Sequence, residues 1–131
     1  KIKKNNLEKN FHITGWVDDI TDYLKLFDIG VLTSKWEGFG LVLAEYMAAK
    51  KPVVATRVDG IEDVVVHNES GFLVESENLE DFTNTILTLL ENESLRNKFV
   101  SNGFERVRKK FSIERVVKEH IELYKEILRK I

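Results

Sequence analysis

The sequence predicts an α/β fold of three layers, with a parallel sheet between two layers of helices, followed by a helical C-terminus. Apolar runs of strand length alternate with segments of helical periodicity, and beyond residue 78 the pattern is helical only. The strand-length runs are apolar throughout, as expected where helices cover both faces of a parallel sheet. Ligands of such sheets bind beyond the carboxyl ends of the strands, so the loops at those ends are where a site is expected.

Four segments have the length and composition of strands. Segment 11–15 alternates apolar and polar residues and ends in glycine, which predicts a short strand. Segments 28–33 and 52–56 are apolar runs suited to strands buried on both faces, and 71–74 is a short last strand. Pro52 stands at the first position of its strand, where it costs no ladder hydrogen bond.

Five segments place apolar residues at helical spacing: 20–27, 41–50, 78–90, 94–107 and 112–131. Asn78 and Ser112 are typical N-cap residues for the third and the fifth of them. The fifth carries one apolar stripe, most simply interpreted as a surface that faces the core. The members of this stripe are Ile113, Val116, Val117, Ile121, Tyr124, Leu128 and Ile131.

The composition fits one domain, 1–131, with 43% hydrophobic and 32% charged residues. The formal net charge of −2 argues against nucleic-acid binding, because binding phosphates needs a basic stripe. Without cysteines, and with its histidines far apart, the chain is expected to hold no metal. No apolar run approaches the ~20 residues of a membrane span, which favours a cytoplasmic protein. The first residue is Lys rather than Met, which suggests a piece of a longer protein.

The loop before the second helix is rich in glycine. Gly38 and Gly40 flank Phe39, and the helix begins near Leu41. Glycines let the backbone approach a ligand closely, and the N–H groups that open a helix attract phosphate. A plain tight turn explains the same glycines, so this pattern alone leaves both interpretations open.

Two carboxylates flank that loop. Glu45 lies on a helix that is apolar nearly all round, so it is expected to line a cavity and meet a polar group there. One turn up the axis from the phosphate seat, it would reach a ribose hydroxyl. The alternative is a surface side chain. Glu37 precedes the glycines, and its carboxylate could accept hydrogen bonds from a sugar or simply complement the helix dipole.

Together these residues spell Glu37-Gly-Phe-Gly-Leu-Val-Leu-Ala-Glu45, two glutamates separated by seven residues. The stretch strongly resembles the E-x7-E motif of the group 1 (family 4) glycosyltransferases, retaining enzymes of the Rossmann-like GT-B architecture. The resemblance runs from roughly Leu7 to Tyr124. It includes, in the family's order, segments 11–17, 28–34, 44–49, 51–56 and 70–74.

The resemblance implies a role for each position of the motif. Glu37 would contact the transferred sugar, as the candidate catalytic residue, and Glu45 would bind the ribose. The donor diphosphate would be held by the backbone amides of Gly38, Phe39, Gly40 and Leu41. The turn beside the base would be Gly15, Trp16 and Val17.

The implied activity is transfer of a sugar from a nucleoside diphosphate sugar, such as a UDP- or GDP-sugar, with retention and without cofactor or metal. The acceptor, a glycan, lipid or small molecule, would bind an N-terminal domain that this chain lacks. The chain alone is therefore expected to be inactive, and the full enzyme to be cytoplasmic or peripheral to the membrane. The last helix would pack on the missing domain, which here would leave apolar surface exposed and favour self-association. Two alternatives remain: a non-catalytic nucleotide-binding module, and a phosphorylase-like or epimerase-like enzyme.

The chain departs from the family pattern at several positions. No residue matches the Arg and Lys that clamp the diphosphate in this family. Glu62 replaces a turn proline, and Lys50 replaces a glycine that often ends the helix, which predicts a looser C-cap. Trp36 is expected to fill the underside of its loop. Arg57, at the end of a strand, is expected to be solvated rather than bound to phosphate.

Overall fold

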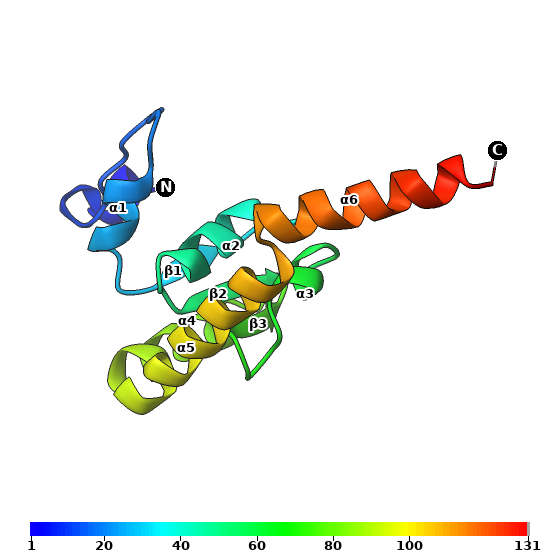
Figure 1. Cartoon of the computed structure of the whole chain (residues 1–131). Helices are drawn as coiled ribbons and strands as arrows, with labels where there is room; N and C mark the ends of the chain where they lie inside the picture. The colour runs from blue at the N-terminus through cyan, green and yellow to red at the C-terminus, as the bar shows by residue number, and fades with distance from the viewer. Residues whose placement is uncertain (131) are drawn as a thin grey trace.

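The computed structural model describes residues 1–130, and its centre is a parallel sheet of three strands in the order β1-β2-β3. The strands are β1 (Gly30–Leu32), β2 (Val53–Arg57) and β3 (Phe72–Glu75). Val31 pairs with Val54, and Ala55 pairs with Leu73. All three carboxyl ends therefore meet at one edge of the sheet, as the alternating pattern of the sequence predicted (Figure 1).

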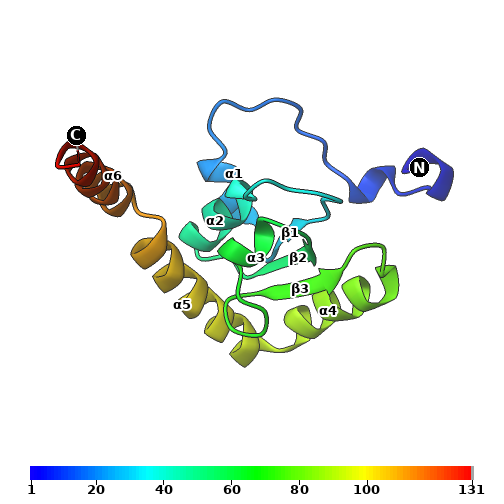
Figure 2. The same cartoon turned by 90° about the vertical axis from the view of Figure 1, so that its right-hand side faces the viewer.

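Helices cover both faces of the sheet, which confirms the three-layer prediction. One face is covered by α2 (Leu41–Ala48), α3 (Ile61–Val64) and the C-terminal part of α5 (Glu93–Lys110). The other is covered by α4 (Leu79–Glu91) and the N-terminal part of α5, and Figure 2 shows α4 and α2 on opposite sides of the sheet. The side chains of β2 are buried from Val53 to Thr56, because both layers close on this central strand.

A glycine lets α5 approach α2 closely. A Cβ atom at Gly103 would lie 3.0 Å from Sδ of Met47, which is 1% exposed. Arg106 continues the contact towards α3, where its guanidinium donates to the carbonyls of Val64 and Asp63, each at 2.7 Å. These contacts hold α2 and α3 against α5, so the helical layer on this face of the sheet is one packed unit.

The strand predicted at 11–15 is wrong. The N-terminal segment contains short 3₁₀ turns at Lys3–Asn5 and Glu8–Asn10, and then α1 (Thr21–Leu26). Residues 11–15 are exposed and pair with no strand among residues 1–130. A strand is stabilised by ladder hydrogen bonds to a neighbour, which this segment lacks. As a result β1 is an edge strand, and Val31 is 38% exposed instead of buried on both sides.

The predicted N-caps are confirmed. Oδ1 of Asn78 accepts from the N–H of Asp81 at 3.1 Å, and Oγ of Ser112 accepts from the N–H of Arg115 at 3.4 Å. Asn92 caps α5 in the same way, since its Oδ1 accepts from the N–H of Leu95 at 2.9 Å. Each cap satisfies one of the N–H groups that a helix start leaves unpaired.

The C-terminus of α2 is well closed, contrary to the expectation from Lys50. The N–H of Lys50 donates to the carbonyl of Met47 at 3.0 Å, and that of Lys51 donates to the carbonyl of Tyr46 at 2.9 Å. This is the complete Schellman pattern. It places Lys50 in the left-handed region, with φ of 57°, where glycine is favoured.

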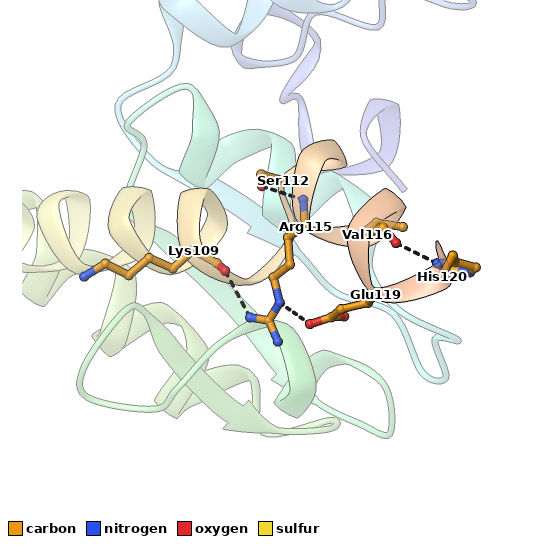
Figure 3. A network of polar contacts seen from close by, with 6 residues as sticks. All are labelled: Lys109, Ser112, Arg115, Val116, Glu119 and His120. Carbon is orange, nitrogen blue, oxygen red and sulfur yellow. Dashed lines mark hydrogen bonds and ion pairs between the residues drawn. The ribbon is translucent and has the colours of Figure 1, made fainter. Parts of the chain in front are cut away.

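Helix α6 (Ile113–Leu128) projects from the body of the molecule (Figures 1 and 2). The interpretation of its stripe as core is wrong, because no residue of α6 is buried, and Ile131 lies outside the described residues. Arg115 sets the direction of the helix: it donates to the carbonyl of Lys109 at 3.0 Å and to Glu119 at 2.6 Å (Figure 3). His120 Nδ1 lies 2.7 Å from the carbonyl of Val116 one turn before it.

Exchanging Lys50 for glycine should stabilise the domain by about 0.5–1 kcal/mol. The left-handed conformation costs an L-residue about 1–2 kcal/mol. Part of this is offset by the cation–π contact of Lys50 with Phe104, whose centroid is 5.0 Å away. Chemical denaturation measures the difference. In the control Lys50→Ala the strain remains and the contact is lost, so stability should fall; a stability equal to that of Lys50→Gly would contradict this account.

The exposed face of α6 should drive reversible self-association of this chain. Ile121 lies in the middle of the stripe and is 45% exposed. Ile121→Lys should abolish concentration-dependent sedimentation, whereas Glu122→Lys, on the polar face, should preserve it. Sedimentation as a monomer at every concentration would contradict this expectation.

Candidate functional site

A glycine in the left-handed conformation starts α2 at the carboxyl edge of the sheet. Gly40 has φ of +72° and is the N-cap of α2, which begins at Leu41. The N–H of Leu43 returns to the carbonyl of Gly40 at 2.9 Å. The first N–H groups of a helix have no partner one turn earlier, and Leu41 is 63% exposed. The start of α2 therefore presents N–H groups and the positive end of the helix dipole to solvent.

The turn after β2 packs directly under this loop. A Cβ atom at Gly60 would lie 2.4 Å from the carbonyl oxygen of Gly38 and 2.6 Å from that of Glu37. Gly60 also has φ of +82°, so both its conformation and its surroundings require glycine. The backbone of Glu37 and Gly38 thus rests on the chain that leaves the central strand.

Two hydroxyl groups connect the core to Glu37. Thr56, near the end of β2, is buried, and its Oγ1 donates to the carbonyl of Ser34 at 2.5 Å. The hydroxyl of Ser34 in turn donates to Oε2 of Glu37 at 3.2 Å. No sequence motif indicated these two contacts; the one signal was a polar residue, Thr56, near the end of an apolar strand.

Glu45 lines an open groove with Trp16 and Val17 of the predicted turn 15–17. The groove, about 610 Å³, lies between α2 and the segment before α1, with Trp16, Val17 and Thr21 among its lining residues. Glu45 is half-buried, as its apolar helix predicted, but its carboxylate has no hydrogen-bond partner within residues 1–130. The polar group expected to meet Glu45 is therefore not supplied by the described chain. Gly15, at the head of the turn, has φ of +69°.

The groove has a marked electrostatic and aromatic character. The next residue of α2, Tyr46, lines a separate cavity with Phe27; burial raises the pKa of Tyr46, and the neighbouring Glu45 carboxylate raises it further. Asp19 accepts from the N–H of Thr21 at 2.8 Å, and hydrogen bonds to Thr21 lower the pKa of this carboxyl. Trp16 is 91% exposed, and its indole N–H donates to Asp18 at 3.1 Å. A flat aromatic face is thus available beside an unpaired carboxylate.

Three aromatic and charged side chains near the loop differ from expectation or add to it. Trp36 is 84% exposed, so its predicted place under the loop is wrong; the turn at Gly60 fills that space. Arg57 is 32% exposed and pairs with Glu62 and with Glu75, so it is not simply solvated. The ion pair with Arg57 gives a reason for the glutamate at position 62, where a turn proline was expected. The ring of Phe39 packs edge-on against Phe111, with centroids 5.4 Å apart.

The comparison with protein families identifies the chain. The model of the family described as glycosyl transferases group 1 matches residues 1–106. This chain belongs to that family. The matched residues include the segment from Glu37 to Glu45, which begins at the carboxyl edge of the sheet.

Curated relatives agree with the family. An uncharacterized glycosyltransferase of Methanocaldococcus jannaschii is 38% identical over 128 residues, which are 96% of this chain and 36% of that protein. The poly(ribitol-phosphate) alpha-N-acetylglucosaminyltransferase of Staphylococcus aureus is 34% identical, over 94% of this chain and 25% of that protein. This chain thus spans about a third of the length of these relatives or less.

Solved structures share the fold. A glycosyltransferase from Rickettsia africae superposes with a TM-score of 0.93 at 29% identity, over 99% of this chain and 35% of that one. HepE of Anabaena, solved with UDP-glucose, gives 0.90 at 27% identity, over 95% of this chain and 35% of that one. The C-terminal domain of a group 1 protein (LpcC) of Francisella tularensis gives 0.76 at 32%, over 86% of this chain and 59% of that one. The fold is that of part of the C-terminal domain of a GT-B glycosyltransferase.

None of the helices within residues 1–130 has both the length and the apolar character needed to cross a membrane.

Gly60→Ala should displace the loop that carries Glu37. The added methyl group meets two carbonyl oxygens, so the loop must shift, and the domain should lose about 2 kcal/mol or more. Backbone amide shifts of residues 37–41 and chemical denaturation measure both effects.

Gly15→Ala is the matched control. Its φ is also positive, but a Cβ atom there has nothing within 4 Å. It should cost only the strain of the left-handed conformation, about 1 kcal/mol, and leave amides 37–41 in place. Equal shifts of amides 37–41 in both variants would contradict the role of Gly60.

Proposed function

We propose that this chain binds the nucleoside diphosphate sugar of a glycosyltransferase that transfers the sugar with retention. One observation carries the proposal: Glu37 and the glycine-led start of α2 lie at the carboxyl edge of the sheet, and the groove of Glu45 runs along the same helix from there. These features follow one another in the order of the sugar, the diphosphate and the nucleoside of such a donor.

The diphosphate would bind at the start of α2. Gly38 is open, with nothing within 4 Å of a Cβ atom there, and Gly40 allows the left-handed start of α2; the N–H groups from Gly38 to Leu41 would donate to phosphate oxygens. As the sugar leaves, negative charge grows on the diphosphate. Fixed N–H groups and the helix dipole stabilise that charge without reorganisation, which would be the chain's main contribution to catalysis.

The ribose would bind to Glu45 and the base beside Trp16 and Val17. Glu45 lies four residues beyond Leu41, hence about 6 Å along the axis of α2. Its carboxylate has no hydrogen-bond partner among residues 1–130 and can accept from two neighbouring hydroxyl groups. The exposed indole of Trp16 offers a surface for a base to stack on.

The sugar would lie against Glu37. One carboxylate oxygen of this residue accepts from Ser34, which leaves Oε1 for sugar hydroxyls. We assign no nucleophile, because no second carboxylate is positioned for that role by a described contact. No cofactor or metal takes part in this scheme. The charge of the diphosphate would be stabilised by backbone amides and by cationic side chains of the complete enzyme.

The solved relatives support the choice of donor. HepE of Anabaena was solved with UDP-glucose, and a variant of TarM of S. aureus with UDP and a GlcNAc-glycerol. By analogy we propose a UDP- or GDP-sugar donor for this chain, and an acceptor glycan, lipid or small molecule bound mainly by another domain. On this basis the 131 residues alone would bind donor without turning it over, in a protein that acts in the cytoplasm or at the membrane surface.

Titration of the isotope-labelled chain with UDP, GDP and ADP tests the proposal. Saturable amide shifts are expected at Gly38, Gly40, Leu41 and Glu45, with one base preferred. Glu45→Gln should weaken nucleotide binding about tenfold, because a hydrogen bond to a charged group is lost. Glu69→Gln, which changes an exposed carboxylate at the opposite edge of the sheet, should leave the affinity unchanged.

Two outcomes would contradict the proposal. The first is saturable binding whose shifts avoid residues 37–45. The second is the absence of binding both in this chain and in the full-length enzyme. Binding of the nucleotide with no gain from the attached sugar would instead favour a non-catalytic nucleotide-binding module.

A further inference from the structure

We infer that Ser34 and Thr56 are positioning residues: together they hold the carboxylate of Glu37 towards the sugar of the bound donor. The inference rests on the proposed function. It adds two side chains that touch neither the sugar nor the diphosphate and act only through Glu37.

The first step is the anchor on the central strand. Thr56 is 6% exposed, and the three residues before it in β2 are fully buried. A hydroxyl group in such a place needs a partner, and it finds the carbonyl of Ser34, 22 residues away in the chain, at 2.5 Å. The loop after β1 is thereby tied to the central, buried strand of the sheet.

The second step passes from the loop to the carboxylate. The hydroxyl of Ser34 donates to Oε2 of Glu37 at 3.2 Å, in a partly buried place. A hydrogen bond to a charged acceptor is stronger than a neutral one, so it selects one orientation of a flexible side chain. Oε1 has no partner among residues 1–130 and is left for the ligand. A side chain that is ordered before binding loses less entropy when the ligand arrives.

A second tie of the same loop provides the contrast. Lys35 pairs with Glu77 at 2.7 Å, which connects the loop to the turn before α4. Both side chains are about three-quarters exposed, at 76% and 74%, and such pairs contribute little. Lys35 does not contact Glu37, so Lys35→Ala is a control that breaks a loop contact and leaves the two hydroxyl groups intact.

The first experiment measures the orientation of Glu37 without any ligand. Three-bond side-chain couplings and the Cδ shift report whether Glu37 keeps one rotamer. One dominant rotamer is expected in the wild type, Ser34→Thr, Thr56→Ser and Lys35→Ala, and averaged rotamers in Ser34→Ala. Thr56→Val should also give averaged rotamers of Glu37. If valine disturbs the strand, Thr56→Ser still tests the hydroxyl group, because serine keeps it and should keep the single rotamer. An unchanged rotamer of Glu37 in Ser34→Ala would overturn the inference.

The second experiment measures the gain in affinity that the sugar provides. UDP and UDP-glucose are titrated into each variant, or GDP and GDP-glucose where GDP binds more tightly. The quantity compared is the dissociation constant of the nucleotide divided by that of its sugar conjugate, which is the gain in affinity from the sugar. Ser34→Ala should reduce this ratio about five- to tenfold and leave UDP binding unchanged. A loss of fold stability would weaken the binding of both ligands by the same factor and leave the ratio unchanged. A change in the ratio therefore indicates a positioning effect.

A double-mutant cycle separates this inference from the proposed function. Glu37→Gln should reduce the same ratio, and adding Ser34→Ala to it should cause no further loss, because both act through one carboxylate. A ratio that falls in Glu37→Gln but not in Ser34→Ala overturns the positioning role alone. A ratio that stays intact in Glu37→Gln overturns the proposed role of Glu37, and the inference with it.

Discussion

The close approach of Gly60 to the carbonyls of Glu37 and Gly38 is the constraint on which the rest of the site depends. No side chain fits between these two stretches of backbone, so the turn after β2 and the loop after β1 form one packed unit. The unit is fixed below by the buried residues of β2 and above by the start of α2 at Gly40. The position of the whole edge follows from the parallel pairing of β1 with β2.

The core reaches the site through hydrogen bonds as well as packing. Thr56 belongs to the central strand, and its hydroxyl supports Ser34, which supports Glu37. The Glu37 carboxylate thus lies at the end of a short chain of contacts that begins in the sheet. Such an arrangement lets a loop residue be as well ordered as the strand beneath it, which is what binding a charged transition state requires.

The C-terminal helices are connected to the same loop. Phe39 lies between the two glycines and packs on Phe111, the C-cap residue of α5. Arg106 stacks over Phe111 with its guanidinium 5.9 Å from the ring and also holds α3. Helix α6 begins two residues beyond, and its direction is set by Arg115 (Figure 3). The start of α6 is therefore connected, through Phe111 and Phe39, to the loop that would hold the diphosphate.

The sequence by itself determined the family, the parallel α/β fold, the N-caps and the glutamates of the motif. These follow from local patterns: apolar runs, helical periodicity and the spacing of residues 37–45. Tertiary structure alone decided which residues meet across the chain: Gly60 under Glu37, Thr56 on Ser34, and Trp16 beside the groove of Glu45. It also decided that 11–15 forms no strand and that α6 is exposed, because pairing and burial depend on neighbours that an amphipathic pattern does not specify.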